Sequence, residues 1–432
     1  MTRISFYTLG CRLNQSETAV LESSFENNGY QVVKFEEPAD IVVVNTCTVT
    51  ENGDADTRKI VNKINRLNPT VRIALVGCQA QVQKKKLTEL PNVHFVVGNA
   101  RKMDLVEIIN DVGARHTQPV VITPTIPRTS FTMPLTGSDR RHTRANLKIQ
   151  DGCNFFCSFC EIPYARGRAR SRIFDDILLE ANSLVAAGHK EIVLTGINVG
   201  TYGHEDKTIL DVLTALESIA GLKRIRISSI EPTTIPWGII EKMKVGATHE
   251  LPLLCRYLHI PIQSGSDDIL KLMQRKYSVQ EYRTFIEKVF QTIPSICLGT
   301  DVIVGFPGET EAHFEETYAL LRDLPFTYFH VFSYSERTMA KSQKFAHPIP
   351  KEIIERRSET LRDLSARKRL MYLQKFLNTE QSVLFEEEKR GFWTGVTDTY
   401  VRVKVPTPGN WHNQILPVRL KSIDRQTIIG EL

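Results

Sequence analysis

The sequence has little of what marks membrane, fibrous or secreted proteins. It contains only eight cysteines among 432 residues, with 24 glycines and 20 prolines, which excludes a disulfide scaffold and a collagen-like chain. No apolar run approaches the roughly 18 residues of a membrane helix. Residues 1–15 show no charged start followed by a long apolar segment, so we expect no secretory signal. We therefore expect a cytoplasmic protein, not bound to a membrane, whose reduced cysteines are available for metals or catalysis.

What the chain does have is the composition of an ordinary globular protein. Hydrophobic residues make up 41% of it and charged residues 24%. The formal net charge is +6, a mild basic excess that permits a nucleic-acid partner without requiring one. A chain of this length is expected to form about three domains.

Residues 1–112 alternate short apolar runs with helical patterns, most clearly at 16–28 and 55–67. This alternation is typical of a doubly wound α/β domain with a parallel sheet. Residues 113–145 contain four prolines and are predicted to be a linker with at most one extended stretch. The strands expected in this domain are Ile4–Leu9, Ile41–Val44, Val71–Val76 and Val93–Val97.

Residues 146–376 resume the alternation, with a helical pattern between each successive pair of apolar runs and a charged helix at 351–376. Six such units predict a partial β/α barrel, whose site lies at the carboxyl ends of its strands. Residues 377–432 contain short strands punctuated by Gly and Pro, which predicts a small antiparallel β-barrel. The expected barrel strands in the middle part are Asn146–Gln150, Glu191–Leu194, Arg224–Ser228, Tyr257–Ile262, Leu298–Val304 and Phe329–Tyr334.

Three closely spaced cysteines follow the first of these barrel strands. Cys153, Cys157 and Cys160 have the spacing C-x3-C-x2-C, which lets one loop hold three corners of a cubic iron–sulfur cluster. Full ligation takes four thiolates, so one iron would stay open for a substrate or cofactor. Zinc is the alternative, but its sites favour four complete ligands and no fourth Cys or His is close in sequence. Cys255 and Cys297 lack such spacing and are expected to pack in the core.

Three further cysteines each follow a predicted strand of the N-terminal sheet. Cys11, Cys47 and Cys78 should gather at the carboxyl edge of a parallel sheet, where ligand sites form. The helix N-termini behind them should favour thiolate, and Asn14 with Glu17 is predicted to cap one helix. A lone cysteine is more often a small buried hydrophobe. Three at equivalent positions instead favour a second cluster with an open iron.

The C-x3-C-x2-C loop resembles the signature of the radical S-adenosylmethionine enzymes. The resemblance implies a [4Fe-4S] cluster whose open iron binds S-adenosylmethionine, and reductive cleavage of that cofactor to a deoxyadenosyl radical. It also implies an electron donor such as a flavodoxin or ferredoxin. The cofactor contacts that it implies, at successive strand ends, are Thr195, Gly196, Asn198, Glu231, Gln263 and Gly305.

The whole chain resembles the methylthiotransferases, which join an N-terminal domain with three separated cysteines to a radical S-adenosylmethionine barrel and a TRAM domain. The resemblance implies two [4Fe-4S] clusters and a tRNA substrate. It implies that one S-adenosylmethionine methylates a sulfur at the N-terminal cluster, while the radical made from a second removes hydrogen from C2 of the target adenine. The motifs that carry it are Gly10-Cys11-Arg12-Leu13-Asn14-Gln15, Asn45-Thr46-Cys47 and Val76-Gly77-Cys78.

The run Arg12–Gln15 is similar to the branch of the family that converts N6-threonylcarbamoyladenosine next to the anticodon to its 2-methylthio derivative. Two alternatives within the same chemistry stay open, namely isopentenyladenosine in tRNA and an aspartate of a ribosomal protein. From another class, a non-catalytic, zinc-containing RNA-binding protein also stays open. The sequence does not identify the sulfur source.

Basic residues surround the expected mouth of the barrel, within residues 140–172. Alternating arginines suit phosphate contacts, which raise affinity without reading sequence; a solvated basic loop is the alternative. Basic and aromatic residues of the C-terminal barrel suit RNA as well, although aromatic residues there are as often core. The predicted RNA contacts are Arg166, Arg168, Arg170, Arg172, Arg402 and Lys404.

Overall fold

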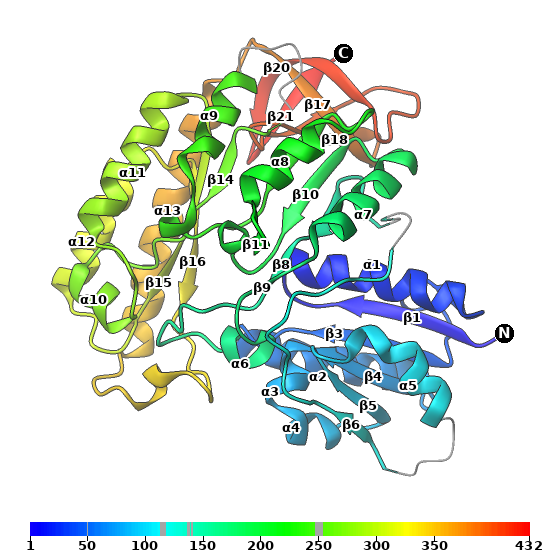
Figure 1. The fold of residues 1–432 in the computed structure, drawn as a ribbon. Helices are drawn as coiled ribbons and strands as arrows, with labels where there is room; N and C mark the ends of the chain where they lie inside the picture. Colours follow the sequence, from blue (N-terminus) through cyan, green and yellow to red (C-terminus); the bar gives the residue numbers. More distant parts are fainter. Residues whose placement is uncertain (50, 113–117, 136–138, 140, 247–253) are drawn as a thin grey trace.

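The computed structural model describes residues 1–49, 51–112, 118–135, 139, 141–246 and 254–432, so Arg140 of the predicted basic stretch lies outside the described residues. Three bodies follow one another along the chain (Figure 1): an α/β domain in blue and cyan, a partial barrel from green to orange, and a small red barrel. In the described part of the chain, no helix combines the length and the apolar character that crossing a membrane requires.

The N-terminal sheet is parallel throughout, with strand order β2-β1-β3-β4-β5-β6. This order, and helices on both faces, confirm the predicted doubly wound fold. Part of the expected linker is a strand of this sheet, because residues 120–122 pair with β5. The strands are β1 Arg3–Thr8, β2 Gln31–Val33, β3 Ile41–Thr46, β4 Arg72–Gly77, β5 Val93–Gly98 and β6 Val120–Ile122. The helices are α1 Arg12–Asn27, α2 Glu51–Leu67, α3 Cys78–Val82, α4 Lys84–Thr88, η1 Lys102–Asp104 and α5 Leu105–Val112.

The continuous apolar run of β3 is explained by burial on both faces of the sheet. Ile41 and Val43 point into one hydrophobic core, and Val42 and Val44 point into the other. A strand with one solvated face would instead alternate apolar and polar residues. The end of β3, directly before Cys47, is therefore held by packing from two sides.

The middle part forms two parallel three-stranded sheets, β13-β10-β7 and β14-β15-β16. Parallel bridges from Ile225 to Leu254 and from Ser229 to His259 join them, so the predicted partial barrel is confirmed. Its edge strand β7 receives α1 of the N-terminal domain, where the Ser16 hydroxyl donates to the carbonyl of Asn146 at 3.2 Å. The barrel strands are β7 Ala145–Lys148, β10 Glu191–Thr195, β13 Arg224–Ile227, β14 Tyr257–His259, β15 Cys297–Val304 and β16 Tyr328–Ser333.

Helices alternate with these strands and surround them. The helices are α6 Ile162–Arg166, α7 Phe174–Ala186, η2 Val199–Thr201, α8 Ile209–Glu217, η3 Pro232–Thr234, α9 Trp237–Gly246, α10 Asp267–Leu272, α11 Val279–Thr292, α12 Glu311–Asp323, η4 Lys341–Lys344 and α13 Lys351–Gln374. Two small ribbons complete this part, one of β8 Gln150–Asp151 with β9 Arg170–Ser171, the other of β11 Gly203–His204 with β12 Lys207–Thr208.

The C-terminal strands close into a barrel of order β17-β18-β19-β21-β20. The predicted small barrel is confirmed with one difference, because β19 and β21 pair in parallel while the other pairs are antiparallel. Its core includes Tyr257 of β14 and Tyr372 of α13, so it packs directly against the middle part. The strands are β17 Glu380–Lys389, β18 Phe392–Thr397, β19 Arg402–Val405, β20 Ile415–Asp424 and β21 Thr427–Glu431.

The predicted capping pair of Asn14 and Glu17 is wrong. Helix α1 begins at Arg12 with Cys11 as its N-cap, and no side chain caps it. Asn14 and Glu17 both lie within α1 and are buried, and both contact Arg166 of the middle part.

We expect Leu213→Ala in α8 to destabilise the protein by about 2–5 kcal/mol, because it leaves a cavity in a filled core. Leu213 is fully buried in the barrel core. Urea denaturation measures the change in the free energy of unfolding. Leu179→Ala in α7 is the control, since that side chain is 60% exposed and should shift stability by no more than about 0.5 kcal/mol. Equal effects of the two variants would contradict the packing described.

Candidate active site

The structure brings Cys11, Cys47 and Cys78 together at the carboxyl edge of the N-terminal sheet; we call them the N-terminal cysteine triad. They follow the ends of β1, β3 and β4. Their thiols are close enough to raise one another's pKa. Gly10 adopts φ +91°, and a Cβ there would lie 2.8 Å from Cys47 Sγ. A glycine is therefore needed for the first and second cysteines to approach each other.

The surroundings of Cys11 and Cys47 keep their metal-free thiols protonated. Burial raises the pKa of Cys47 to about 12, and the neighbouring Cys78 and Cys11 add to the rise. Burial also raises the pKa of Cys11, although the Arg166 guanidinium opposes it. The expected thiolate-favouring effect of the helix N-termini is thus outweighed by desolvation. Binding a metal group here would release protons, because the bound ligand is the thiolate.

Cys153, Cys157 and Cys160, the barrel cysteine triad, lie in the loop between β8 and α6. Backbone N–H groups point at two of the sulfurs: Phe155 donates to Cys153 Sγ and Ile162 to Cys160 Sγ, both at 3.4 Å. Burial raises the pKa of Cys153 to about 11. These N–H donors suit sulfurs that carry negative charge, as the ligands of an iron–sulfur cluster do.

The distances between the sulfurs distinguish a cluster site from a zinc site. Among the described residues, neither cysteine triad brings three ligand atoms all within 4.8 Å of one another. A tetrahedral zinc with Zn–S bonds of roughly 2.3 Å needs its sulfurs about 4 Å apart. The cysteines are therefore too widely spaced for one zinc ion and leave room for a larger group such as a cubic cluster.

Polar atoms without partners line the strand ends beside the barrel cysteine triad. Within the described part of the chain, Thr195 Oγ1, Asn198 Nδ2 and Ser228 Oγ are buried and have no hydrogen-bond partner. Buried polar atoms are normally paired. Their presence at the ends of β10 and β13, where Thr195 and Asn198 were predicted to contact a cofactor, fits a polar ligand such as the amino-acid part of S-adenosylmethionine.

Gln150 holds the turn after β10 and was not found from the sequence. Its Oε1 accepts from the backbone N–H groups of Ile197 and Asn198, both at 2.9 Å. Its Nε2 donates to the carbonyl of Gly152 at 2.8 Å, directly before Cys153. A Cβ at Gly196 would lie 2.9 Å from Gln150 Oε1. Gly196 is therefore needed for this turn to reach the cysteine loop.

Glu231 forms an ion pair with Arg275, and the same guanidinium donates to Cys157 Sγ at 3.2 Å. Arg275 therefore joins a predicted cofactor contact to a predicted cluster ligand. Sequence reasoning missed it, because a lone arginine after a helix carries no spacing signal. Its pairing with Tyr277, whose hydroxyl accepts from Arg275 Nε at 3.0 Å, fixes the guanidinium further.

The last two predicted cofactor contacts lie in different surroundings. Gln263 has φ +72° and lines a cavity of about 160 Å³ that also includes Phe159 of the cysteine loop. Gly305 has φ +79°, and a Cβ there would clash with Ile354 of α13. Its lack of a side chain makes room for that helix, so its predicted contact to a cofactor stays a prediction.

A large cavity, of about 510 Å³, lies where the three bodies meet. Cys11 lines it, which explains why this residue is exposed although protein surrounds its thiol. One wall holds His259, Asp301 and His330, whose ligand atoms lie within 4.8 Å of one another and could hold a cation or a polar base. The cavity is also lined by Arg12 from α1, by Thr195 and Ser228 from the barrel, and by Tyr400 from the C-terminal barrel.

Two of the predicted RNA contacts are wrong. Arg166 and Arg172 are fully buried. Arg172 pairs with Asp176 at 2.5 Å and with Glu180, so neither guanidinium can reach a phosphate. The alternating arginines suggested phosphate contacts, but Glu17 and Asp151 bury Arg166, and Asp176 and Glu180 of α7 bury Arg172.

The other predicted RNA contacts are more accessible. Arg168 is exposed and stacks on Phe156, with its guanidinium carbon 4.2 Å from the ring centroid. Arg170 is mostly buried and pairs with Asp151 at 3.3 Å. Arg402 is exposed, and Lys404 pairs with Asp424. Arg168 and Arg402 are thus the two exposed cations of the predicted set.

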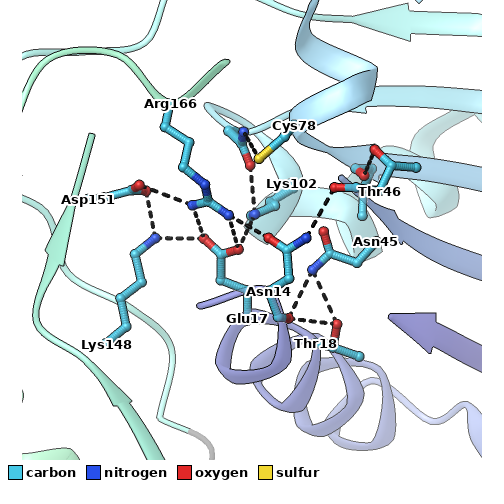
Figure 2. Close-up of polar contacts among 12 residues, drawn as sticks. Asn14, Glu17, Thr18, Asn45, Thr46, Cys78, Lys102, Lys148, Asp151 and Arg166 are labelled. Atoms are coloured by element: carbon cyan, nitrogen blue, oxygen red, sulfur yellow. Dashed lines mark hydrogen bonds and ion pairs between the residues drawn. The ribbon is translucent and has the colours of Figure 1, made fainter. Parts of the chain in front are cut away.

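A buried set of charges joins the N-terminal domain to the barrel (Figure 2); we call it the interdomain charge network. Glu17 of α1 accepts from Arg166 at 2.9 Å, from Lys148 at 2.7 Å and from Lys102. Asp151 accepts from Lys148 at 2.7 Å and from Arg166 at 3.0 Å. With Arg170, these six side chains are each at most 10% exposed.

The network sets the protonation of its members. Burial pushes the pKa of Glu17 upward, but Arg166, Lys102 and Lys148 outweigh it and hold the pKa well below its usual range. Burial lowers the pKa of Lys102 to about 8, even though Glu17 opposes the shift. Both groups are therefore mainly charged at neutral pH.

Two protein-family models match the chain. Residues 147–321 match the radical SAM superfamily, and residues 3–98 match a family described as uncharacterized protein family UPF0004. The first match contains the barrel cysteine triad, and the second contains the N-terminal cysteine triad.

Curated relatives cover nearly the whole chain. A protein of Bacillus subtilis (strain 168), named threonylcarbamoyladenosine tRNA methylthiotransferase MtaB, is 36% identical over 97% of this chain and 94% of its own length. A protein of Protochlamydia amoebophila (strain UWE25), named tRNA-2-methylthio-N(6)-dimethylallyladenosine synthase, is 32% identical over 98% of this chain and 95% of its own length.

Among solved structures, the radical S-adenosylmethionine methyltransferase TsrM from Kitasatospora setae, with cobalamin and a [4Fe-4S] cluster bound, has a TM-score of 0.55 to this chain. The two are 16% identical over 77% of this chain and 75% of that one. This likeness shows a shared fold.

We expect Arg275→Gln to destabilise the protein by about 3 kcal/mol, because Glu231 keeps a largely buried charge that has lost its partner. Urea denaturation measures the loss. Arg283→Gln is the matched control: its partner Glu287 is 47% exposed, so the change should be no more than about 1 kcal/mol. An Arg275 variant as stable as the control would contradict the role given to this ion pair.

Proposed function

This chain belongs to the methylthiotransferase family of radical S-adenosylmethionine enzymes, and from that membership we propose that its substrate is N6-threonylcarbamoyladenosine next to the anticodon of tRNA. Members of the family add a methylthio group by radical chemistry, and the relatives reported above are named for tRNA nucleosides. The product proposed here is the 2-methylthio derivative of that nucleoside. Relatives named for threonylcarbamoyladenosine support this choice, and relatives named for dimethylallyladenosine provide the second candidate.

The choice of substrate rests on the surroundings of Arg12. It lines the large cavity next to Cys11. Its guanidinium contacts Asn146 Oδ1 at 3.4 Å and the Tyr400 hydroxyl, and no carboxylate of the described residues forms an ion pair with it. A threonylcarbamoyl group has a free carboxylate, whereas a dimethylallyl group is apolar. A half-buried cation without an acidic partner therefore favours the anionic substituent.

The acidity of Tyr400 supports a positive potential in this part of the cavity. Burial raises its pKa, but Arg12, followed by Arg144 and Arg226, reverses the effect, and the net result is a lowered pKa. Such a potential would attract an anionic group of the substrate. The positive potential would disfavour an apolar substituent only weakly. Discrimination between the two candidate substrates therefore rests mainly on the contact of Arg12 with the substrate carboxylate.

We assign the two cysteine triads to two [4Fe-4S] clusters. The family implies the cluster at the barrel triad together with S-adenosylmethionine, and the cluster at the N-terminal triad is part of this proposal. When bound, these groups supply the deoxyadenosyl radical and the sulfur that is transferred, with electrons from a donor such as a flavodoxin or ferredoxin. An aromatic C–H bond is too strong for acid–base chemistry, which is why a radical cofactor is needed.

The chain's own residues bind and orient the reactants and exclude water from the site. Arg275 donates to Cys157 Sγ and fixes the carboxylate of Glu231 beside it. Thr195 Oγ1 and Asn198 Nδ2 are free to take the amino-acid part of S-adenosylmethionine. The large cavity is lined by Cys11 and by these strand ends, so an adenine splayed from the anticodon loop would meet both in one cavity.

The outer parts of the chain suit the tRNA backbone. We assign residues 1–112 to the sulfur-carrying domain, residues 113–145 to the connection, residues 146–376 to the radical barrel with its trailing helix, and residues 377–432 to a TRAM-like RNA-binding barrel. The exposed Arg168 and Arg402 are the proposed phosphate contacts. Lys404 can join them only by leaving Asp424.

After anaerobic reconstitution, we expect Cys157→Ala to abolish formation of deoxyadenosine, because the barrel cluster would lose a ligand. Cys47→Ala should retain deoxyadenosine formation and lose methylthiolation of tRNA. Iron and sulfide analysis should give about eight irons per wild-type chain and about four in Cys47→Ala.

Cys255→Ala is the control, since this buried cysteine lies outside both triads. This variant should keep the iron content of the wild type and its cleavage of S-adenosylmethionine to deoxyadenosine. Undiminished cleavage in Cys157→Ala would show that the barrel triad is not the radical site. Zinc in place of iron would overturn the enzyme assignment in favour of a structural RNA-binding protein.

We expect Arg12→Gln to lower kcat/KM for a threonylcarbamoyladenosine stem-loop by about 10- to 100-fold, which corresponds to roughly 1.4–2.8 kcal/mol for a lost contact between two charges. The methyl ester of the same nucleoside should react equally with both proteins. Mass spectrometry of the nucleosides measures the product. A wild-type enzyme that prefers dimethylallyladenosine would establish the second candidate instead.

A further inference from the structure

The interdomain charge network does not balance its own charges. It contains two carboxylates, Glu17 and Asp151, and four cations, Lys102, Lys148, Arg166 and Arg170. Arg172 nearby shows the usual arrangement, because Asp176 and Glu180 surround its single charge. Buried charge without a counter-charge is costly, so the two excess positive charges call for an anionic group close by.

The cationic side of the network faces the N-terminal cysteine triad. Lys102 Nζ donates to Asn99 Oδ1 at 2.7 Å, and Asn99 Nδ2 donates to Cys78 Sγ at 3.5 Å. Arg166 interacts electrostatically with Cys78 and with Cys11. Lys102 and Arg166 therefore direct positive charge at these sulfurs.

The same two cations hold the loops that carry the triad. Arg166 Nη2 donates to Asn14 Oδ1 at 2.6 Å, and Asn14 Nδ2 donates to the carbonyls of Leu9 and Thr46, at 2.8 and 3.1 Å, beside Cys11 and Cys47. The other amide hydrogen bond of Asn99 goes to the carbonyl of Ala165 in α6, at 2.7 Å. Helix α6 begins shortly after the barrel triad. A single buried unit thus contacts the backbone beside Cys11 and Cys47 and the helix that follows the barrel triad.

We infer that the excess positive charge of the network is the counter-charge of an iron–sulfur cluster at the N-terminal triad, and that Lys102 and Arg166 are positioning residues that set its retention and its reduction potential. The inference rests on the second cluster of the proposed function. A cubic cluster held by three thiolates is net negative, and nearby positive charge favours the reduced, more negative state. The cluster would in turn stabilise the contact between the two domains.

The test changes the net charge of the network in both directions. Lys102→Met removes one positive charge, Glu17→Gln removes one negative charge, and the double variant restores the wild-type balance. Each is made in a full-length chain whose barrel triad is replaced by Ala, so that only the N-terminal cluster is observed. A redox titration followed by electron paramagnetic resonance measures the potential, and a chelator challenge measures iron loss.

We expect the potential to become more negative in Lys102→Met and more positive in Glu17→Gln, and to return close to the wild-type value in the double variant. Iron loss should be roughly 10- to 100-fold faster in Lys102→Met, the usual effect of removing a residue behind a metal ligand. Lys85→Gln removes an exposed charge from α4 of the N-terminal domain and should change neither quantity, because solvent screens it.

A merely structural role would give a different pattern. Both single variants would then lose iron faster, with the double variant no better than either, and that outcome would overturn the inference. If Lys102→Met does not fold, a potential in Glu17→Gln equal to that of the wild type would overturn it equally. A wild-type chain with only one cluster would instead refute the proposed function, which the iron count detects first.

Discussion

The buried ion pairs between Glu17 and the cations of the barrel are the interaction on which the rest of the site depends. They join α1 of the N-terminal domain to Lys148 at the end of β7 and to Arg166 at the end of α6. No strand of one domain pairs with a strand of the other across this boundary among the described residues. Charged groups in such a boundary must meet their partners, or they would be desolvated without compensation. The network therefore fixes the relative position of the two domains more strictly than apolar packing would.

The relative position of the two domains determines which residues line the large cavity. The partial barrel leaves β7 as an edge, and α1 covers that edge. Because α1 begins at Arg12, directly after Cys11, covering the edge also brings one cysteine of the N-terminal triad to the cavity wall. Tyr400 of the C-terminal barrel closes another side of the cavity. The cavity is thus lined by residues of all three domains.

The burial of the arginines shows how a sequence pattern can mislead. Alternate arginines at 166–172 predicted phosphate contacts, and two of them are instead fully buried. The charge of an arginine is visible in the sequence, but its acidic partners are not, since Glu17 lies 149 residues from Arg166. For the same reason the sequence assigned Glu17 to a helix cap and gave no role to Lys102, Gln150 or Arg275.

The sequence alone determined the α/β class, the three-part order, the partial barrel and the two sets of cysteines, because strand periodicity and the C-x3-C-x2-C spacing are local properties of the chain. The gathering of Cys11, Cys47 and Cys78 could also be anticipated, since parallel strands end at one edge of a sheet. Only the tertiary structure decided which charges are buried, which arginines face solvent and where Arg12 lies. Those properties depend on contacts between residues far apart in sequence, and no local pattern encodes such contacts.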